Sequence, residues 1–294
     1  MTNAPTSIAL RTLAALSSTL ALMLAVVPAH SGERLTGTWG VSQIEGAGGG
    51  GLVPWALITG SGSRDAVGAI AFATRTRTQG GFGLNVAGAA VGLHDTVEAS
   101  LTQWRFGLSD TVPGQSLKLN IVGLKWRVFG DTVYDQDKPW PQLAIGAQFK
   151  HNPAFGIPAA LGAAHARDTD FYVAATKVWL AGLGGFNTLA NLSLRSTRAN
   201  QFGLLGFGGP LSDRRSWRAE ASLAVLLRDD LALGGEWRDK PNNLASFREE
   251  RAADLFAAWF VNRHLSLTLA WVDLGNIANK PGQRGAYLSV QGAL

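Results

Sequence analysis

Residues 141–150 read PQLAIGAQFK, and in this stretch apolar and polar side chains alternate. Successive side chains of an extended strand point to opposite faces, so this alternation separates an apolar face from a polar one. The apolar face holds Leu143, Ile145, Ala147 and Phe149, and the polar face holds Gln142, Gln148 and Lys150. A strand with one side toward lipid and the other toward a polar lumen is typical of a transmembrane β-barrel.

The composition of the whole chain agrees with this interpretation. Charged residues make up 16% of the 294 residues, against roughly 25% in soluble domains. Beyond the N-terminus there is no apolar run of the length that a transmembrane helix needs, which excludes a multi-pass helical protein. The absence of cysteine excludes disulfide frameworks and thiol chemistry. A secreted β-sandwich is the competing fold, although its solvent faces would need more charge.

Applying the same alternation test along the chain predicts an all-β, antiparallel, up-and-down transmembrane barrel of about fourteen strands, with twelve possible. An even number is expected of a bacterial barrel. The predicted strands lie near 34–45, 52–60, 66–78, 82–92, 97–106, 117–128, 141–150, 169–180, 186–198, 216–227, 231–239, 254–262, 265–273 and 286–294.

The connections between these strands alternate between short and long, as periplasmic turns and extracellular loops do. Residues 130–140 and 79–81 are exceptions, because the first should be short and is long, and the second should be long and is short. Trp217, Trp237 and Trp271 fall near strand ends on the lipid-facing parity, which predicts an aromatic girdle.

The N-terminus resembles a secretory signal. Arg11 precedes an apolar stretch over residues 13–27, and small residues follow it. We expect residues 1–29 to be cleaved after Ala29, with Ser31 as the alternative site and an uncleaved membrane anchor as the competing interpretation. Residues 30–294 would then form the barrel, located in the bacterial outer membrane.

Charged residues on the inward parity are the candidate functional side chains. Across the short turn at 228–230, antiparallel register places Glu220 opposite Arg238, with Arg218 and Glu236 nearby. This cluster could set ion selectivity near the outer mouth. It could equally be an ion-pair network that satisfies polar groups inside the barrel.

Six further basic residues take the inward parity and would give a wet, net positive lumen with a modest preference for anions. They are Arg75, Arg77, Lys125, Arg127, Lys150 and Arg195. The net charge of the chain is +5. Because its basic residues are scattered along the chain, nucleic acid is not an expected partner.

Several stretches resemble an uncharacterised family of exported Proteobacterial proteins, a domain of unknown function numbered three-zero-three-four. They are GVSQIEGAGGGGLVPWA from Gly40, VGLHDTVEASL from Val91, IVGLKWRVFGDTVYDQDKPWPQLAIGAQFK from Ile121, RANQFGLLGFGG from Arg198, EWRDKPNNL from Glu236, and AWVDLGNI from Ala270 with QRGAYLSVQ after it. The resemblance spans nearly the whole chain after the signal and implies an outer-membrane barrel. It implies no activity.

Other constellations are weak. His151, His165, Asp168 and Asp170 match no known metal spacing, and the aspartates at 131, 135 and 137 lack the glycine and distal glutamate of a calcium loop. His94 and His264 fall in short turns, and no GxSxG motif is present. We therefore expect no cofactor, no metal and no enzyme activity.

The sequence favours a passive or weakly selective channel for small polar, and in particular anionic, solutes. The alternative is a closed structural barrel that docks partners through its outer loops, and an outer-membrane hydrolase comes third. The expected partners are outer-membrane lipid, the barrel-assembly machinery during biogenesis and small polar solutes. The sequence leaves the oligomeric state open.

Overall fold

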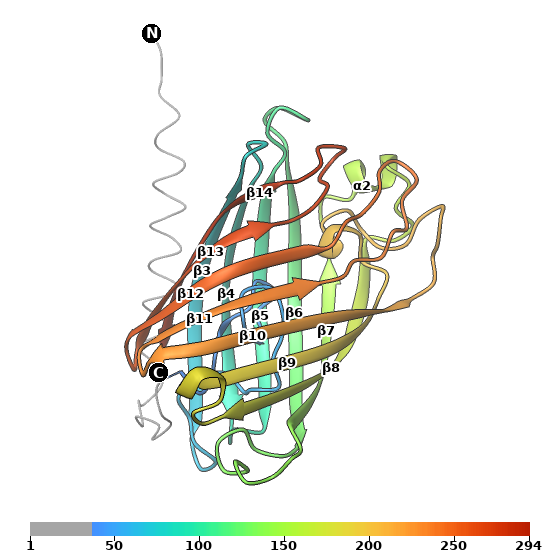
Figure 1. The fold of residues 1–294 in the computed structure, drawn as a ribbon. Coiled ribbons are helices and arrows are strands. Elements are labelled where there is room, and N and C mark those ends of the chain that lie inside the picture. The colour runs from blue at the N-terminus through green and yellow to red at the C-terminus, as the bar shows by residue number, and fades with distance from the viewer. Residues whose placement is uncertain (1–36) are drawn as a thin grey trace.

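The computed structural model describes residues 37–294, which form a closed antiparallel β-barrel (Figure 1). In this part of the chain twelve strands form the wall, each paired with its neighbours in sequence. They are β3 (Val67–Thr78), β4 (Gly83–Leu93), β5 (Val97–Gly107), β6 (Ser116–Phe129), β7 (Gln142–His151), β8 (Arg167–Trp179), β9 (Asn187–Thr197), β10 (Ser216–Arg228), β11 (Leu231–Arg238), β12 (Ala252–Asn262), β13 (Leu265–Asp273) and β14 (Arg284–Ala293). The signal peptide expected at residues 1–29 lies outside the described residues.

Pairing of the first and last strands closes the wall. β14 pairs with β3 from Gly285 opposite Thr78 to Ala293 opposite Ile70, so neither strand keeps a free edge. The all-β up-and-down barrel expected from the sequence is confirmed, with twelve wall strands, the lower of the two expected numbers. Within residues 37–294 no helix is long and apolar enough to cross a membrane.

The two ends of the barrel differ in their connections. At one end, which we call the long-loop end, the connections are 79–82, 108–115, 152–166, 198–215, 239–251 and 274–283. The 152–166 loop contains the short helix α2 (Gly156–Ala160). The opposite end, where β3 begins and β14 finishes, is the terminal end, and its connections are 94–96, 130–141, 180–186, 229–230 and 263–264. Both exceptions noted in the sequence are present, a short turn at 79–82 and a long connection at 130–141.

The outer face of the wall is apolar. In β7, Ile145 and Phe149 are exposed while Gln148 and Lys150 are buried, as the alternation of this strand predicts. Seven tryptophans lie on the outside in two groups, one near each end. Near the long-loop end are Trp217, Trp237 and Trp271, and near the terminal end are Trp126, Trp140, Trp179 and Trp259. Such paired aromatic girdles mark the two interfaces of a membrane, so the wall is built to span one.

The lumen is filled by residues 37–62, which we call the plug. Figure 1 shows this segment looping inside the barrel. Residues 39–62 are all buried. Its two short strands, β1 (Val41–Ser42) and β2 (Gly48–Gly49), pair with each other and not with the wall. The expectation that 34–45 and 52–60 are wall strands is therefore wrong for the described residues, 37–45 and 52–60.

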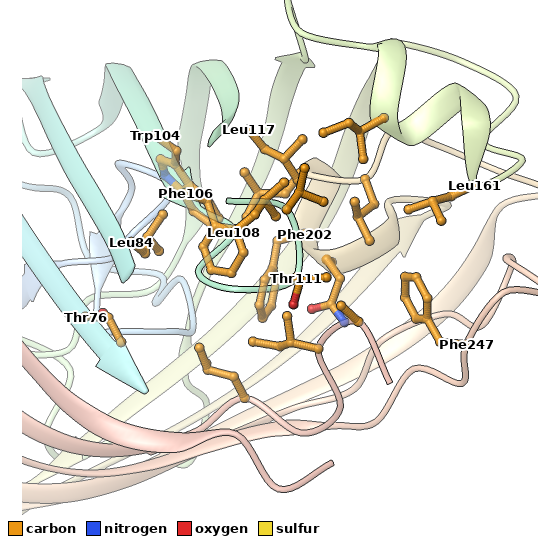
Figure 2. A pocket seen from close by; sticks show the side chains of 18 of the residues that line it. Thr76, Leu84, Trp104, Phe106, Leu108, Thr111, Leu117, Leu161, Phe202 and Phe247 are labelled. Atoms are coloured by element: carbon orange, nitrogen blue, oxygen red, sulfur yellow. The ribbon is translucent and has the colours of Figure 1, made fainter. Parts of the chain in front are cut away.

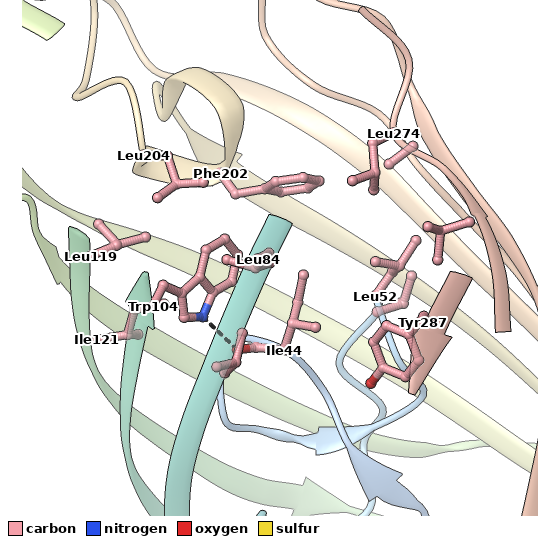
Figure 3. Packing of buried hydrophobic residues seen from close by; sticks show 14 of the residues in the cluster. Ile44, Leu52, Leu84, Trp104, Leu119, Ile121, Phe202, Leu204, Leu274 and Tyr287 are labelled. Atoms are coloured by element: carbon pink, nitrogen blue, oxygen red, sulfur yellow. Dashed lines mark hydrogen bonds between the residues drawn. The ribbon is translucent and has the colours of Figure 1, made fainter. Parts of the chain in front are cut away.

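The composition of the plug explains that error. A wall strand needs one apolar face, whereas a segment surrounded by the wall needs apolar and small side chains on every side. Figure 3 shows Ile44 and Leu52 packed among wall residues such as Trp104, whose indole N–H donates to the Ile44 carbonyl at 2.7 Å. Glycines permit this fit, because a Cβ at Gly50 would lie 2.0 Å from an oxygen of Glu236.

Enclosure of the plug predicts its chemical protection. Since the chain contains no cysteine, a single introduced thiol reports on one position. A thiol at Ser42→Cys, where the native side chain is 1% exposed, should react with 4,4′-dithiodipyridine far more slowly than one at exposed Ala245→Cys. Both should react at the same rate after unfolding in urea. Equal rates in the folded protein would mean that the plug does not occupy the lumen.

Candidate functional site

The plug is fixed to the wall by hydrogen bonds from several strands. Glu98 on β5 accepts the backbone N–H groups of Gly48 at 3.0 Å and Thr59 at 2.9 Å. Glu236 on β11 accepts the N–H of Leu52 at 2.5 Å. On β7 and β9, Gln142 donates to the Ala56 carbonyl at 2.7 Å, and Ser193 to that of Pro54 at 2.9 Å. These contacts satisfy backbone groups that a chain outside regular secondary structure would otherwise leave unpaired.

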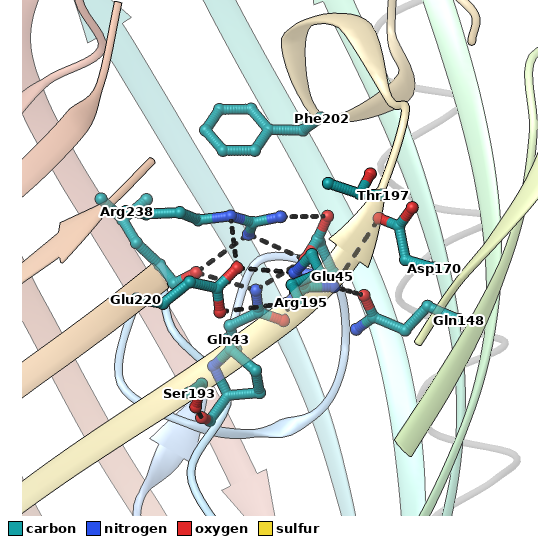
Figure 4. A network of polar contacts seen from close by, with 12 residues as sticks. Gln43, Glu45, Gln148, Asp170, Ser193, Arg195, Thr197, Phe202, Glu220 and Arg238 are labelled. Carbon is teal, nitrogen blue, oxygen red and sulfur yellow. Dashed lines mark hydrogen bonds and ion pairs between the residues drawn. The ribbon is translucent and has the colours of Figure 1, made fainter. Parts of the chain in front are cut away.

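A buried network of charges forms the centre of this interface (Figure 4). Glu45 of the plug forms ion pairs with three wall cations, Lys150, Arg195 and Arg238. The Arg238 contact measures 2.8 Å, and each of these side chains is at most 3% exposed.

Two wall carboxylates complete the network. Glu220 lies 2.6 Å from Arg195 and 3.1 Å from Arg238, and Asp170 lies 2.7 Å from Lys150. Three carboxylates therefore face three cations, and Glu45 is the member that the plug supplies.

The surroundings of Glu45 keep its side chain ionised. Burial by itself would raise the pKa of this carboxyl, since burial disfavours the charged form. Arg238, Lys150 and Arg195 outweigh that effect, so the pKa lies well below its ordinary value of 4.5. Removing one member of such a buried network leaves the others uncompensated, at a cost of about 3–5 kcal/mol.

The structure brings together the cluster expected across the 228–230 turn. Glu220 pairs in register with Arg238, although a bulge between Leu226 and Arg228 shifts the pairing next to the turn. Glu236 binds Ser222 at 2.7 Å as well as the plug backbone. Arg218 stays apart from the network and pairs with Asp239 at 3.1 Å, nearer the long-loop end.

The other inward candidates divide into three groups. Lys150 and Arg195 belong to the network, and Lys125 pairs with Glu98 at 3.0 Å while donating to the Gly48 carbonyl of the plug. Arg127 lies at the terminal end, where Asp95 and Asp131 each pair with it.

The expected inward orientation of Arg75 and Arg77 is wrong. Both side chains are exposed on the outer face of β3. The threonines at 74, 76 and 78 take the inward positions instead. A one-residue error of parity reverses every side chain of a strand, and both faces of this threonine–arginine alternation are polar enough to suit either assignment.

The expected wet, net positive lumen is also wrong. Each inward cation named above has a carboxylate partner within the barrel or at its rim. The plug occupies the space that water would fill. Lys125 and the three cations around Glu45 therefore hold the plug, and the inward charges do not give the lumen an excess of positive charge.

An apolar cavity of about 250 Å³ lies between the plug and the long loops (Figure 2). Ile44 and Leu52 of the plug form its floor, and wall residues such as Trp104 and Phe106 form one side. Five of the loops contribute to its roof through Val112, Ile157, Leu204, Phe247 and Ile277. Carbon atoms dominate this lining, and sequence periodicity did not reveal the cavity because its roof comes from separate loops.

Phe202 connects the cavity with the charge network. Its ring lines the cavity and lies 4.5 Å from the guanidinium carbon of Arg238, with Trp104 at 6.2 Å in an edge-on arrangement. Phe202 and the preceding Gln201 both have positive φ values, 63° and 45°, which non-glycine residues adopt at a cost. Gln201 is held in place by Glu249, which accepts its N–H at 2.9 Å.

The weak metal candidates are engaged in ion pairs. Asp168 pairs with Arg198 and Arg215, and Asp170 pairs with Lys150. His165 contacts Asp213 at 3.0 Å. Over residues 37–294 no group of three or more acidic or histidine side chains is arranged to hold a metal ion.

Comparison with protein families identifies the chain. A family model described as a protein of unknown function (DUF3034) matches residues 38–291. The chain belongs to this family. The match includes both the plug and the wall, and it confirms the resemblance carried by the quoted stretches. No curated protein matches the sequence.

Among solved structures, the NanC porin has a TM-score of 0.48 at 10% identity, covering 76% of this chain and 98% of the porin. The COG4313 outer membrane channel from Pseudomonas putida F1 gives 0.41 at 11%, covering 82% and 96%. Outer membrane phospholipase A from Escherichia coli gives 0.38 at 10%, covering 76% and 88%. These scores are below 0.5, and the barrel fold is defined by the strand pairing of the chain itself.

The network predicts how docking of the plug depends on pH. A carboxyl group whose pKa is lowered by folding stabilises the folded state above its ordinary pKa, and this stability is lost as the pH falls through the lowered value. The thiol of Ser42→Cys should therefore stay protected from about pH 8 to about pH 5. Its exposure should rise only well below 4.5, the ordinary pKa of Glu45.

Reaction with 4,4′-dithiodipyridine, which detects thiols in acid, measures this exposure, and Ala245→Cys provides the reference rate at each pH. In a Glu45→Gln background the thiol should already be more exposed at neutral pH. Loss of protection above pH 4.5 in the parent variant would show that Glu45 does not hold the plug.

Proposed function

We propose that this protein is a bacterial outer-membrane barrel that binds a small apolar molecule at its long-loop mouth and is closed beneath that site by its own plug. In this proposal the long loops face the outside of the cell and the terminal end faces the periplasm, as the alternation of loop lengths in such barrels indicates. The exposed apolar wall and its two tryptophan girdles support a location in the membrane.

The cavity is the observation that carries the proposal. A dry apolar cavity of about 150 Å³ can hold benzene, so a volume of about 250 Å³ suits a substituted single ring or a short aliphatic chain. The cavity lies on the long-loop side of the plug, where a molecule arriving from outside would meet it first. Its apolar lining favours such molecules over the anionic solutes that the basic inward residues suggested.

Passage across the membrane requires the plug to move. Phe202 gives a ligand in the cavity a route to the network, because the ring contacts both the cavity and Arg238, which holds Glu45. A ligand that shifts this ring changes the contact beneath the Arg238 guanidinium. The proposed protein is thus a gated channel, with binding at the mouth and release of the plug as successive steps.

A closed docking barrel is the second candidate, and the matched charges around the plug favour it. Its lumen would never open. The hydrolase interpretation has less support, since within residues 37–294 neither the His94 nor the His264 ring contacts a serine hydroxyl. The His94 ring contacts the Arg64 carbonyl, and the His264 ring contacts the Ala293 carbonyl and the Arg263 guanidinium.

Binding at the mouth is tested by placing a charge in the cavity. Val112→Asp puts a carboxylate among the lining side chains, on a loop where it leaves the wall intact. We expect it to weaken binding of ethylbenzene at least about tenfold, because an unpaired charge is costly in an apolar site. Isothermal titration calorimetry of the refolded protein in detergent measures this.

The matched control is Leu211→Asp, since Leu211 is 57% exposed on another loop of the same end. It should bind like the parent protein, and it also corrects for partition of the ligand into micelles. Equal binding by both variants would remove the cavity from the proposal.

Gating is tested by loosening the plug. In planar bilayers the parent protein should be silent or open rarely, and Glu45→Gln should give frequent stable openings, because three buried cations lose their shared anion. Glu250→Gln, an exposed carboxylate in the 239–251 loop, is the control. A folded Glu45→Gln barrel that stays silent would favour the closed docking barrel.

A further inference from the structure

Four basic side chains form a patch on the outer face of the wall. They are Arg75 and Arg77 on β3, Arg105 on β5 and Lys118 on β6, and all four are exposed. We call this set the basic patch. It lies toward the long-loop end of these strands, on the side of the barrel that faces lipid.

Strand register brings the four residues of the basic patch together. Arg75 is paired with Asn85, Asn85 with Arg105, and Arg105 with Lys118. Neighbouring strands lie about 4.8 Å apart, so Arg105 and Lys118 are about 5 Å apart at the backbone and Arg75 is about 10 Å from Arg105. Arg77 is two residues further along β3, about 7 Å from Arg75. The patch is the size of one polar headgroup with more than one anionic group.

The basic patch has no carboxylate beside it on the wall. The outward positions of β3 to β6 hold no aspartate or glutamate. Elsewhere at the same end, exposed arginines do pair with carboxylates, as Arg215 does with Asp168 and Arg284 does with Asp273. Within residues 37–294, the four positive charges of the basic patch therefore have no carboxylate partner on the wall strands that carry them.

The position of the basic patch relative to lipid is defined by the rows below it. The next outward row toward the middle of the wall contains Gln103 paired with Asn120, and the row after that contains Leu101 paired with Val122. The surface therefore changes from charged to polar to apolar within two rows. At the same end, Trp217, Trp237 and Trp271 occupy the interface on β10, β11 and β13.

We propose that the basic patch binds the phosphate groups of a multiply phosphorylated glycolipid in the outer leaflet. Arginine recognises phosphate oxygens with paired, charge-assisted hydrogen bonds, and lysine adds a point charge. The occupant must also lie against the apolar rows directly below, which acyl chains attached to the same headgroup would do. A soluble acidic protein offers no such apolar part, so the adjoining apolar wall favours lipid. The orientation of the patch in the cell rests on the proposed function.

The test uses the refolded full-length protein in detergent, titrated with diphosphoryl lipid A and followed by native mass spectrometry. The patch variant is Arg75→Gln, Arg77→Gln, Arg105→Gln and Lys118→Gln. Each basic residue near a membrane surface adds to the attraction of anionic lipid, so we expect lipid A to bind the patch variant at least about tenfold more weakly.

The control variant removes the same charge from exposed residues outside the patch, with Arg214→Gln, Arg248→Gln, Arg251→Gln and Arg263→Gln. It should bind lipid A within about twofold of the parent protein. Lipid A stripped of both phosphates should bind the parent and the patch variant equally. Inorganic phosphate alone should fail to compete at concentrations near that of the lipid.

Equal binding of lipid A by the parent and the patch variant would overturn the proposal, as would equal loss in the control variant. Competition by inorganic phosphate at low concentration would assign the patch to a free anion instead of a lipid. Heat-modifiable mobility in gel electrophoresis checks that each variant is folded, and the double variant Arg105→Gln and Lys118→Gln serves if the quadruple one fails. Binding of lipid A in detergent does not depend on the apolar cavity, so the two proposals fail separately.

Discussion

The ion pairs of Glu45 are the interaction on which the rest of the structure depends. Lys150, Arg195 and Arg238 come from three different strands and point to the same place, where a single carboxylate of the plug meets them. Without that carboxylate the wall would enclose uncompensated charge in a space from which water is largely excluded, which is strongly unfavourable. With it, the plug is held in one position, and that position in turn forms the floor of the apolar cavity.

Alternation of side chains was enough to predict most of the wall. The period of two in 141–150 recurs along the chain, and the turn at 228–230 was short enough to fix the pairing of Glu220 with Arg238. It failed where both faces of a segment are alike. In 74–78 threonine and arginine suit either side of the wall, and in the plug small and apolar residues suit every side.

The candidate site was predicted in part and for the same physical reason. The inward cations were recognised by parity, but their partner lies in a segment without a regular period, so spacing alone could not place Glu45 among them. One signal could have identified Glu45. It is a lone acidic residue just before the glycine-rich run 46–51, in a chain whose predicted inward cations lacked an anion. The cavity could not be predicted from the sequence, because its roof is formed by five loops whose positions depend on tertiary contacts.

The plug precedes every wall strand in the chain, yet it lies within the ring that the last strand closes by pairing with the first. This arrangement constrains the order of assembly. If β14 joined β3 around an empty interior, Glu98 and Lys150 would be enclosed with their wall partners alone, before the plug groups that complete their contacts had arrived. Pairing of β14 with β3 and entry of the plug are therefore coupled, so the wall assembles around a segment of its own chain.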